Sequence, residues 1–257
     1  MIDAHTHLYS DKYDKDLESV INRARKRLTA VIISAVDSES LQKSLDIRHQ
    51  HQDFIYVTAG IHPRTTAEIN HEDLKQLLNT IDRVRRNIVA LGEGGPDFYH
   101  IRDPLQQQRQ LQVLNEFLVH AEKWGLPLVV HAREAESAAL DVLSQSKTAV
   151  MFHCFAGSKQ MAGKITDHGF YISFSAILLT SPELQETAAS IPQELILTET
   201  DSPALSPLPD KTRNEPVFVE KIVSCLAKQL KCTLELAAKI TEENARRFYG
   251  LPNRPEA

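Results

Sequence analysis

The chain has 257 residues, of which 42% are hydrophobic and 25% charged, so it can bury a core that needs no disulfides or structural metal. Its net charge of -5 provides no overall positive field for gathering nucleic acid, although it does not exclude a local basic patch. The three cysteines form no Cys-x-x-Cys pair, the N-terminal segment has no apolar signal core and no apolar run approaches the roughly 18 residues of a membrane span, which together predict a soluble, cytoplasmic protein.

Short apolar segments rich in β-branched residues alternate along the chain with longer segments of helical periodicity. The expected strands are Ile2–His5, Ala30–Ala35, Phe54–Gly60, Ile88–Gly92, Pro127–His131, Ala149–His153, Phe170–Phe174 and Leu195–Glu199. The expected helices are Lys15–Leu28, Glu39–His51, Glu72–Arg86, Pro104–Trp124, Glu134–Gln145, Ser158–His168, Pro182–Ser190, Pro216–Leu230 and Thr233–Tyr249.

This alternation predicts the α/β class, because apolar strands separated by helices form a parallel sheet that is covered on both faces. Eight such units at this length favour a single (β/α)8 TIM barrel. An open doubly wound sheet is the alternative, but its glycine-rich turn after the first strand is absent and His5-Thr6-His7 stands there instead. We expect one catalytic domain at 1–251 and a disordered tail at 252–257.

Histidines and acidic residues recur where the expected strands end. Residues two apart on a strand point to the same face, so His5 and His7 can bind one metal ion. In a barrel the carboxyl ends of all strands meet at one face, and the side chains that end the other strands are therefore expected to converge there. Those side chains are His62, Glu93, His131, His153 and Asp201.

The joint pattern predicts a two-metal site. An isolated His-x-His pair, or a single histidine at a strand end, is more often structural, and it is the recurrence at successive strand ends that indicates ligands. Imidazole and carboxylate ligands suit Zn, Mn, Fe or Ni, and carboxylate-rich sites also accept Mg. The expected ligands are His5, His7, Glu93, His131, His153 and Asp201. These six exceed the needs of one tetrahedral ion, whereas two ions roughly 3.5–4 Å apart and bridged by a carboxylate use them all. No acidic residue is better placed to bridge than Glu93.

The remaining histidines lie on expected helices or loops and are interpreted as surface residues. They are His49, His51, His71, His100, His120 and His168. The basic segments 23–27 (RARKR) and 83–86 (RVRR) are interpreted as solvated helix faces and not as a nucleic-acid surface.

In these residues the chain resembles the TatD family of metal-dependent hydrolases, which belong to the amidohydrolase-like barrels. The matching stretches are MIDAHTHL, AGIHP, ALGEGGPDFY, LPLVVHAREA, VMFHCFAG, ISFSAILL, LTETDSPAL, RNEP and TEENARRFYGL, in family order from Met1 to Leu251. The chain departs from the family pattern at Gly94 and Pro96, where apolar residues and Leu are usual, and at Thr6, where Cys is frequent.

The resemblance implies roles for the six ligands. His5, His7 and Asp201 would hold the first ion, Glu93 would bridge the two ions, and His131 and His153 would hold the second. Asp201 would also orient or deprotonate the attacking water. The ions would be Mg, Mn or Zn, which the ligands do not distinguish.

The resemblance also implies phosphodiester hydrolysis, as a deoxyribonuclease that acts from the 3′ end of single-stranded DNA. Arg133, two residues after His131, could bind a phosphate in bidentate fashion or form a salt bridge to a neighbouring helix. His62 could contact the same phosphate or the leaving group. We expect a nucleic-acid substrate and no obligate protein partner.

Three other functions are compatible with the sequence. Some relatives are linked to deacylation of D-aminoacyl-tRNA, which the metal ligands cannot separate from phosphodiester hydrolysis because both use the same activated water. A metal-dependent hydrolase of small esters or amides is the second possibility. A non-enzymatic scaffold that has kept the fold would be expected to lose ligands, yet all six are present. The features that would distinguish these functions are the expected substrate loops Gly94–Arg102 and Ser202–Glu215.

Overall fold

The computed structural model describes residues 1–210 and 213–252. It contains one sheet of eight parallel strands that neighbour one another in chain order. The strands are β1 (Ile2–Thr6), β2 (Ala30–Ala35), β3 (Ile55–Ala59), β4 (Ala90–Gly94), β5 (Leu128–Val130), β6 (Val150–Phe152), β7 (Tyr171–Phe174) and β8 (Ile196–Thr198).

The sheet curls into a nearly closed barrel. A parallel bridge joins Thr6 to Ser202, and the Asp201 amide donates to the carbonyl of His5 at 3.0 Å. The His7 amide likewise donates to the carbonyl of Ser202 at 2.7 Å. The segment after β8 is thereby bonded to β1, which confirms the expected barrel and excludes the open sheet.

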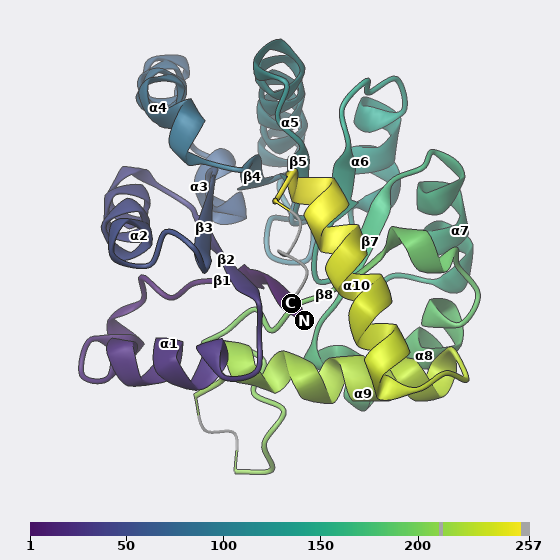
Figure 1. Cartoon of the computed structure of the whole chain (residues 1–257). Helices are drawn as coiled ribbons and strands as arrows, with labels where there is room; N and C mark the ends of the chain where they lie inside the picture. The colour runs from purple at the N-terminus through teal and green to yellow at the C-terminus, as the bar shows by residue number, and fades with distance from the viewer. Residues whose placement is uncertain (211–212, 253–257) are drawn as a thin grey trace.

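Helices surround the strands, and in Figure 1 most of them form a ring around the barrel. They are α1 (Leu17–Arg25), α2 (Ser38–Gln50), α3 (Pro63–Thr66), α4 (His71–Val84), α5 (Pro104–Trp124), α6 (Glu136–Leu143), α7 (Lys159–Asp167), α8 (Pro182–Ala188), α9 (Val219–Gln229) and α10 (Leu234–Tyr249). Short 3-10 turns occupy Asp11–Tyr13, Arg85–Asn87, Ala176–Leu179, Gln193–Leu195 and Pro216–Phe218.

The longest helix, α5, has sequence signals at both of its ends. The Asp103 side chain accepts hydrogen bonds from the Leu105 and Gln106 amides, and Pro104 occupies the first turn, where its missing N–H costs nothing. Gly125 ends the helix at φ 67°, a left-handed conformation that glycine adopts without strain. These signals explain why the expected bounds of this helix agree with the structure.

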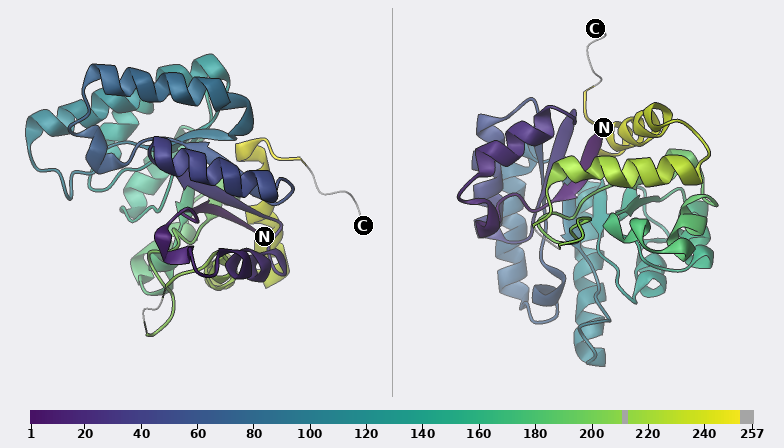
Figure 2. Two further views of the ribbon diagram at one scale, coloured as in Figure 1. Left: turned by 90° about the vertical axis from the view of Figure 1, so that its left-hand side faces the viewer. Right: turned by 90° about the horizontal axis from the view of Figure 1, so that it is seen from below.

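The final helix, α10, closes one end of the barrel. Its Phe248 and Tyr249 pack against the inward-facing side chains of β1, including Ile2 and Ala4, and the Tyr249 hydroxyl donates to the carbonyl of Ala4 at 2.8 Å. Figure 1 shows α10 crossing the end of the barrel at which the chain begins. The right-hand view of Figure 2 shows α9 beside α10, with Val223 of α9 packed against α10. The opposite end of the barrel, where the strands finish, is left open for a site.

Several expected bounds shift. β4 runs two residues further than expected, so Glu93 lies inside the strand and not after it. The short helix α3 was not anticipated, and the helix expected from Pro216 begins only at Val219, after a 3-10 turn. Of the expected tail, residues 253–257 lie outside the described part of the chain. Within the described ranges, no helix is long and apolar enough to cross a membrane.

The basic segment 23–27 has a structural role. Arg23 is paired with Glu215, Arg25 with Asp53 and Arg27 with Glu220. These guanidinium groups are bound to carboxylates on the surface of the barrel, so they do not contribute to a phosphate-binding face.

Candidate active site

All six expected ligands lie at the open, carboxyl end of the barrel. His5 is on β1 and Glu93 on β4, and both are buried. His7, His131 and His153 directly follow β1, β5 and β6, and Asp201 lies three residues after the end of β8. The barrel thus brings together side chains from both ends of the sequence.

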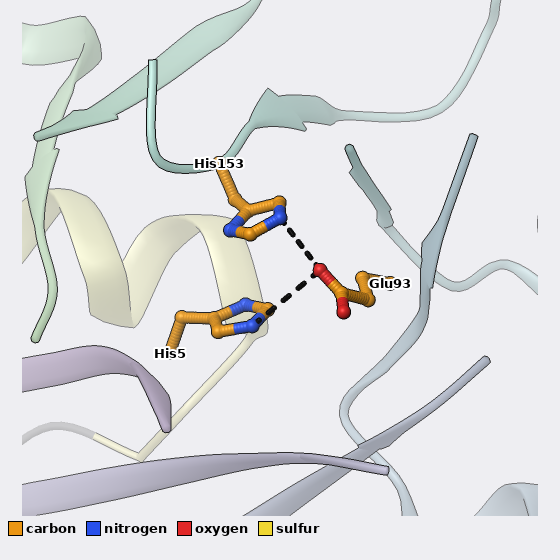
Figure 3. Close-up of side chains that lie close together, drawn as sticks. All are labelled: His5, Glu93 and His153. Atoms are coloured by element: carbon orange, nitrogen blue, oxygen red, sulfur yellow. Dashed lines mark ion pairs between the residues drawn. The ribbon is translucent and has the colours of Figure 1, made fainter. Parts of the chain in front are cut away.

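The Glu93 carboxylate is the centre of one group of side chains. Its Oε2 lies 2.6 Å from His153 Nε2 and 3.7 Å from His5 Nε2. Figure 3 shows both imidazoles facing this carboxylate. His131 Nδ1 is 3.9 Å from the same oxygen and 3.2 Å from His153 Nε2. One carboxylate oxygen therefore faces three imidazoles that come from three strands.

The Asp201 carboxylate is the centre of a second group. Its Oδ1 lies 3.2 Å from His7 Nε2 and 3.8 Å from His5 Nε2, and the two imidazole nitrogens are 3.3 Å apart. His5 belongs to both groups, and in each of the triads His5–Glu93–His153 and His5–His7–Asp201 the possible ligand atoms lie within 4.8 Å of one another. Each triad therefore has donor atoms close enough to hold a divalent cation, and the two triads share His5.

The surroundings of His7 fit a cation at this donor set. His7 Nδ1 lies 3.0 Å from the backbone carbonyl of Ser34, which can only accept, so this nitrogen carries the proton. When the imidazole is neutral, the lone pair is on Nε2 and faces the Asp201 carboxylate. Burial lowers the pKa of His7, but the hydrogen bond and charge of Asp201 outweigh it and raise that pKa, so a positive charge is favoured at this position. Two acceptors in contact repel each other unless a positive charge lies between them, and a divalent ion supplies that charge.

The Nδ1 atoms of His5 and His153 also have polar partners. His5 Nδ1 contacts the Ser34 hydroxyl at 3.1 Å, and His153 Nδ1 lies 3.3 Å from Glu199 Oε1. Metal-binding histidines commonly use their second nitrogen in this manner, which fixes the ring orientation and the tautomer.

Burial and charge set the protonation of the cluster. Burial lowers the pKa of His153, but Glu93 and Glu199 outweigh it and raise that pKa well above its ordinary value. Burial by itself raises the pKa of Glu93, but the facing histidines, chiefly His153, outweigh it and hold that pKa well below its usual range. Burial lowers the pKa of His5 well below its ordinary value, so this imidazole is neutral at physiological pH. An ionised carboxylate beside a neutral imidazole is the state in which both bind a metal ion.

A cavity of about 650 Å³ opens above the cluster. His7, Glu93, His131, His153 and Asp201 line it together with side chains from the β/α loops. Among these loop side chains are His62, Arg64, His100 and Arg133. This volume is that of a site for a small-molecule or nucleotide-sized group.

Both expected substrate contacts lie in this cavity. His62 precedes α3, and its Nδ1 accepts a hydrogen bond from the Arg64 amide at 3.2 Å. The Arg133 guanidinium carbon lies 3.9 Å from the centre of the Tyr99 ring. Among residues 1–210 and 213–252 no carboxylate is paired with Arg133, so the salt bridge considered as its alternative role is not formed.

The segment 94–96, where the chain departs from the family pattern at Gly94 and Pro96, makes close backbone contacts. A Cβ on Gly95, at φ 139°, would lie 2.2 Å from the carbonyl oxygen of His131, so only glycine fits there. A Cβ on Gly94 would meet the ring of Phe117 at 3.4 Å, away from the cavity. The absence of a side chain at Gly94 therefore alters packing against α5, not the lining of the cavity.

Some residues around the ligands escaped the sequence-based prediction. Asp97 Oδ2 lies 3.3 Å from His131 Nε2 and 2.8 Å from His100 Nδ1, and His100, interpreted above as a surface residue, borders the cavity. Glu199 contacts His153 and also accepts a hydrogen bond from Ser173. The spacing of Glu199 two residues before Asp201 repeats that of His5 and His7 and was an available signal. Nothing in the sequence indicated Asp97 as a partner of His131.

Comparison with solved structures supports the assignment of the fold. A structure described as YJJV, a TatD homologue from Escherichia coli K12, has a TM-score of 0.90 at 24% identity and covers 98% of both chains. A phosphotriesterase homology protein from Escherichia coli, complexed with phosphate in its active site, has a TM-score of 0.68 at 15% identity, with 96% of this chain and 98% of that chain covered. At these identities the likeness shows a shared barrel architecture.

Proteins with similar sequences identify the family of this chain. The chain is 30% identical over 258 residues to the uncharacterized metal-dependent hydrolase YabD of Bacillus subtilis (strain 168), covering 98% of this chain and 99% of that protein. It is also 30% identical over 265 residues to the 3'-5' ssDNA/RNA exonuclease TatD of Pantoea ananatis (strain LMG 20103), covering 98% and 100%. The family model described as TatD related DNase matches residues 2–250. The chain therefore belongs to the TatD family and is a metal-dependent hydrolase.

Proposed function

We propose that this hydrolase is a two-metal phosphodiesterase that shortens single-stranded DNA from its 3′ end. The observation that carries the proposal is the pair of ligand groups that share His5 at the floor of a cavity. The wall of this cavity holds the Arg133 guanidinium, which pairs with no carboxylate of residues 1–210 and 213–252. Relatives named 3'-5' ssDNA/RNA exonuclease TatD, from Pantoea ananatis and Erwinia amylovora, support the choice of substrate.

In the proposed site, His5, His7 and Asp201 would hold the first divalent ion, His131 and His153 would hold the second, and Glu93 would be a ligand of both. The donor set suits Mg, Mn or Zn. When bound, such ions polarise the phosphoryl oxygen and lower the pKa of the attacking water.

The side chains of the protein provide the remaining functions. The Asp201 carboxylate, which is partly open to the cavity, takes the proton of the attacking water as general base. Arg133 donates two hydrogen bonds to the non-bridging phosphate oxygens, a pairing that the planar guanidinium favours. His62 at the cavity mouth contacts the phosphate or the leaving group.

The test is hydrolysis of single-stranded DNA, labelled at one end or the other, by protein that has been stripped of metal and resupplied with Mg or Mn. We expect shortening from the 3′ end only with metal and only by the wild type, with Glu93→Ala inactive. If two ions bind but DNA stays intact, the nuclease proposal is wrong, and D-aminoacyl-tRNA and a panel of neutral esters and amides become the substrates to assay.

A further inference from the structure

One residue of the cavity wall, Arg133, belongs to an aromatic and cationic cluster that is separate from the metal-ligand groups. It consists of Tyr99 and Arg102, from the loop after β4, and Arg133, from the loop after β5. The guanidinium carbons of Arg133 and Arg102 lie 3.9 Å and 5.7 Å from the centre of the Tyr99 ring. The Tyr99 side chain is unusually open for a large aromatic, with 44% of its surface exposed.

The two arginines of this cluster differ in what binds their charge. Arg102 donates to Glu134 Oε2 at 3.0 Å, so a carboxylate already compensates it. Arg133 is stacked on the Tyr99 ring and, within the described ranges, forms no ion pair. A guanidinium held by the face of an aromatic ring keeps its N–H donors, which lie in its plane, available to another anion.

The backbone fixes the cluster to the metal site. The Arg133 amide donates to the carbonyl of Pro96 at 3.2 Å, and the Phe98 amide donates to the carbonyl of Arg133 at 2.9 Å. Asp97 and Arg133 form a parallel bridge, and Asp97 itself contacts the expected ligand His131. Tyr99 and Arg133 therefore stand at a fixed position beside the ligands.

We propose that Tyr99 and Arg133 form a subsite for the nucleotide next to the scissile phosphate. This inference rests on the proposed action on single-stranded nucleic acid. Tyr99 is a positioning residue that holds the Arg133 guanidinium toward the cavity, and the unpaired base stacks on the exposed part of this pair. Bases stack on aromatic rings and guanidinium planes without regard to sequence. Because a base within a duplex is already stacked on its neighbours, the subsite selects single strands.

The experiment combines protein variants with substrates that have or lack the base. Single-stranded DNA with a normal or an abasic nucleotide beside the cleaved bond is given to the metal-loaded wild type, Tyr99→Leu and Tyr99→Phe. We expect Tyr99→Leu to raise KM for normal DNA about tenfold with kcat within about twofold, because stacking and cation–π contacts act on binding. Tyr99→Phe retains the ring and should match the wild type, as should the control Val119→Ala on the exposed face of α5.

The decisive result is whether the effect of the base on binding depends on the Tyr99 ring, which is called the coupling below. The wild type should bind abasic DNA about tenfold more weakly than normal DNA, whereas Tyr99→Leu should bind both alike. A Tyr99→Leu variant that still distinguishes the two substrates as the wild type does would overturn the subsite. So would a loss of kcat with unchanged KM, which indicates a structural role.

A binding measurement separates this inference from the nuclease proposal. Fluorescence anisotropy of the same oligonucleotides, with metal-stripped protein, needs no turnover. If the wild type cleaves no DNA but the coupling appears in binding, the nuclease proposal fails and the subsite stands. If cleavage occurs but the coupling is absent in both assays, the subsite fails alone.

Discussion

Asp201 shows how a single residue links the fold to the chemistry. Its amide donates to the carbonyl of His5 and so helps to close the barrel, while its carboxylate faces His7 Nε2 at 3.2 Å. Its φ of 55° is in the left-handed region, which Asp tolerates better than most residues. The backbone thus turns the carboxylate toward the ligand cluster at the point where β8 ends.

We predict that Asp201→Asn lowers kcat by about 10²–10⁴-fold, because the amide neither accepts a proton from water nor supplies a charged ligand. Circular dichroism should show an unchanged fold, since the amide retains the shape of the side chain. The control is Asp141→Asn on the exposed surface of α6, which should behave as the wild type. Near-normal turnover by Asp201→Asn would remove this residue from the mechanism.

Asp97 is predicted to act through His131. Replacing it with Ala leaves His131 Nε2 without its acidic neighbour at 3.3 Å and frees the ring to turn. We expect affinity for Mn²⁺, measured by calorimetry, to fall about 10–100-fold, as for other residues that support metal ligands. His100→Ala removes the other partner of Asp97 and serves as the control. If it weakens metal binding equally, orientation of His131 is not the cause.

At the scale of the elements, two glycines of similar surroundings should respond in opposite ways to the same substitution. A Cβ on Gly125, after α5, or on Gly163, inside α7, would have no heavy atom within 4 Å. Only the backbone differs, because Gly125 has a φ of 67° and Gly163 is helical.

We predict that Gly125→Ala destabilises the protein by about 1 kcal/mol, the cost of a side chain in the left-handed region. Gly163→Ala should stabilise it by about 0.5–1 kcal/mol, because the chain loses less entropy on folding. Urea denaturation measures both. Equal effects of the two substitutions would show that backbone conformation does not determine the response.

The barrel as a whole separates stability from chemistry at its two ends. α10 covers one end, where Phe248 packs against Tyr171 with ring centroids 5.2 Å apart. The ligands stand at the other end, on strand ends and the loops that follow. Changes under α10 should therefore alter the free energy of unfolding with little effect on the site.

We predict that Phe248→Ala lowers the free energy of unfolding by about 3–5 kcal/mol, through lost burial and the cavity left behind. Metal affinity and kcat of the folded protein should be retained. Leu236→Ala, at an exposed position of α10, is the control and should change stability by no more than about 0.5 kcal/mol. A loss of metal binding by folded Phe248→Ala would contradict the separation of the two ends.

The sequence by itself determined the barrel and the convergence of the six side chains that are proposed as metal ligands. Strand periodicity places His5 and His7 on one face, and the ends of parallel strands must meet, so local pattern and topology were sufficient. The bounds of α5 could also be predicted from the sequence, because the residues that cap this helix lie next to it in the chain.

The tertiary structure alone decided which residues support the ligands. Asp97 reaches His131, Arg133 stacks on Tyr99 and His100 joins the cavity because closure of the barrel brings the β4 and β5 loops together. Such contacts depend on side-chain direction and loop path, which no periodicity records. The physical reason is that strand ends are positioned by the backbone pattern, whereas contacts between loops are set by packing across the assembled barrel.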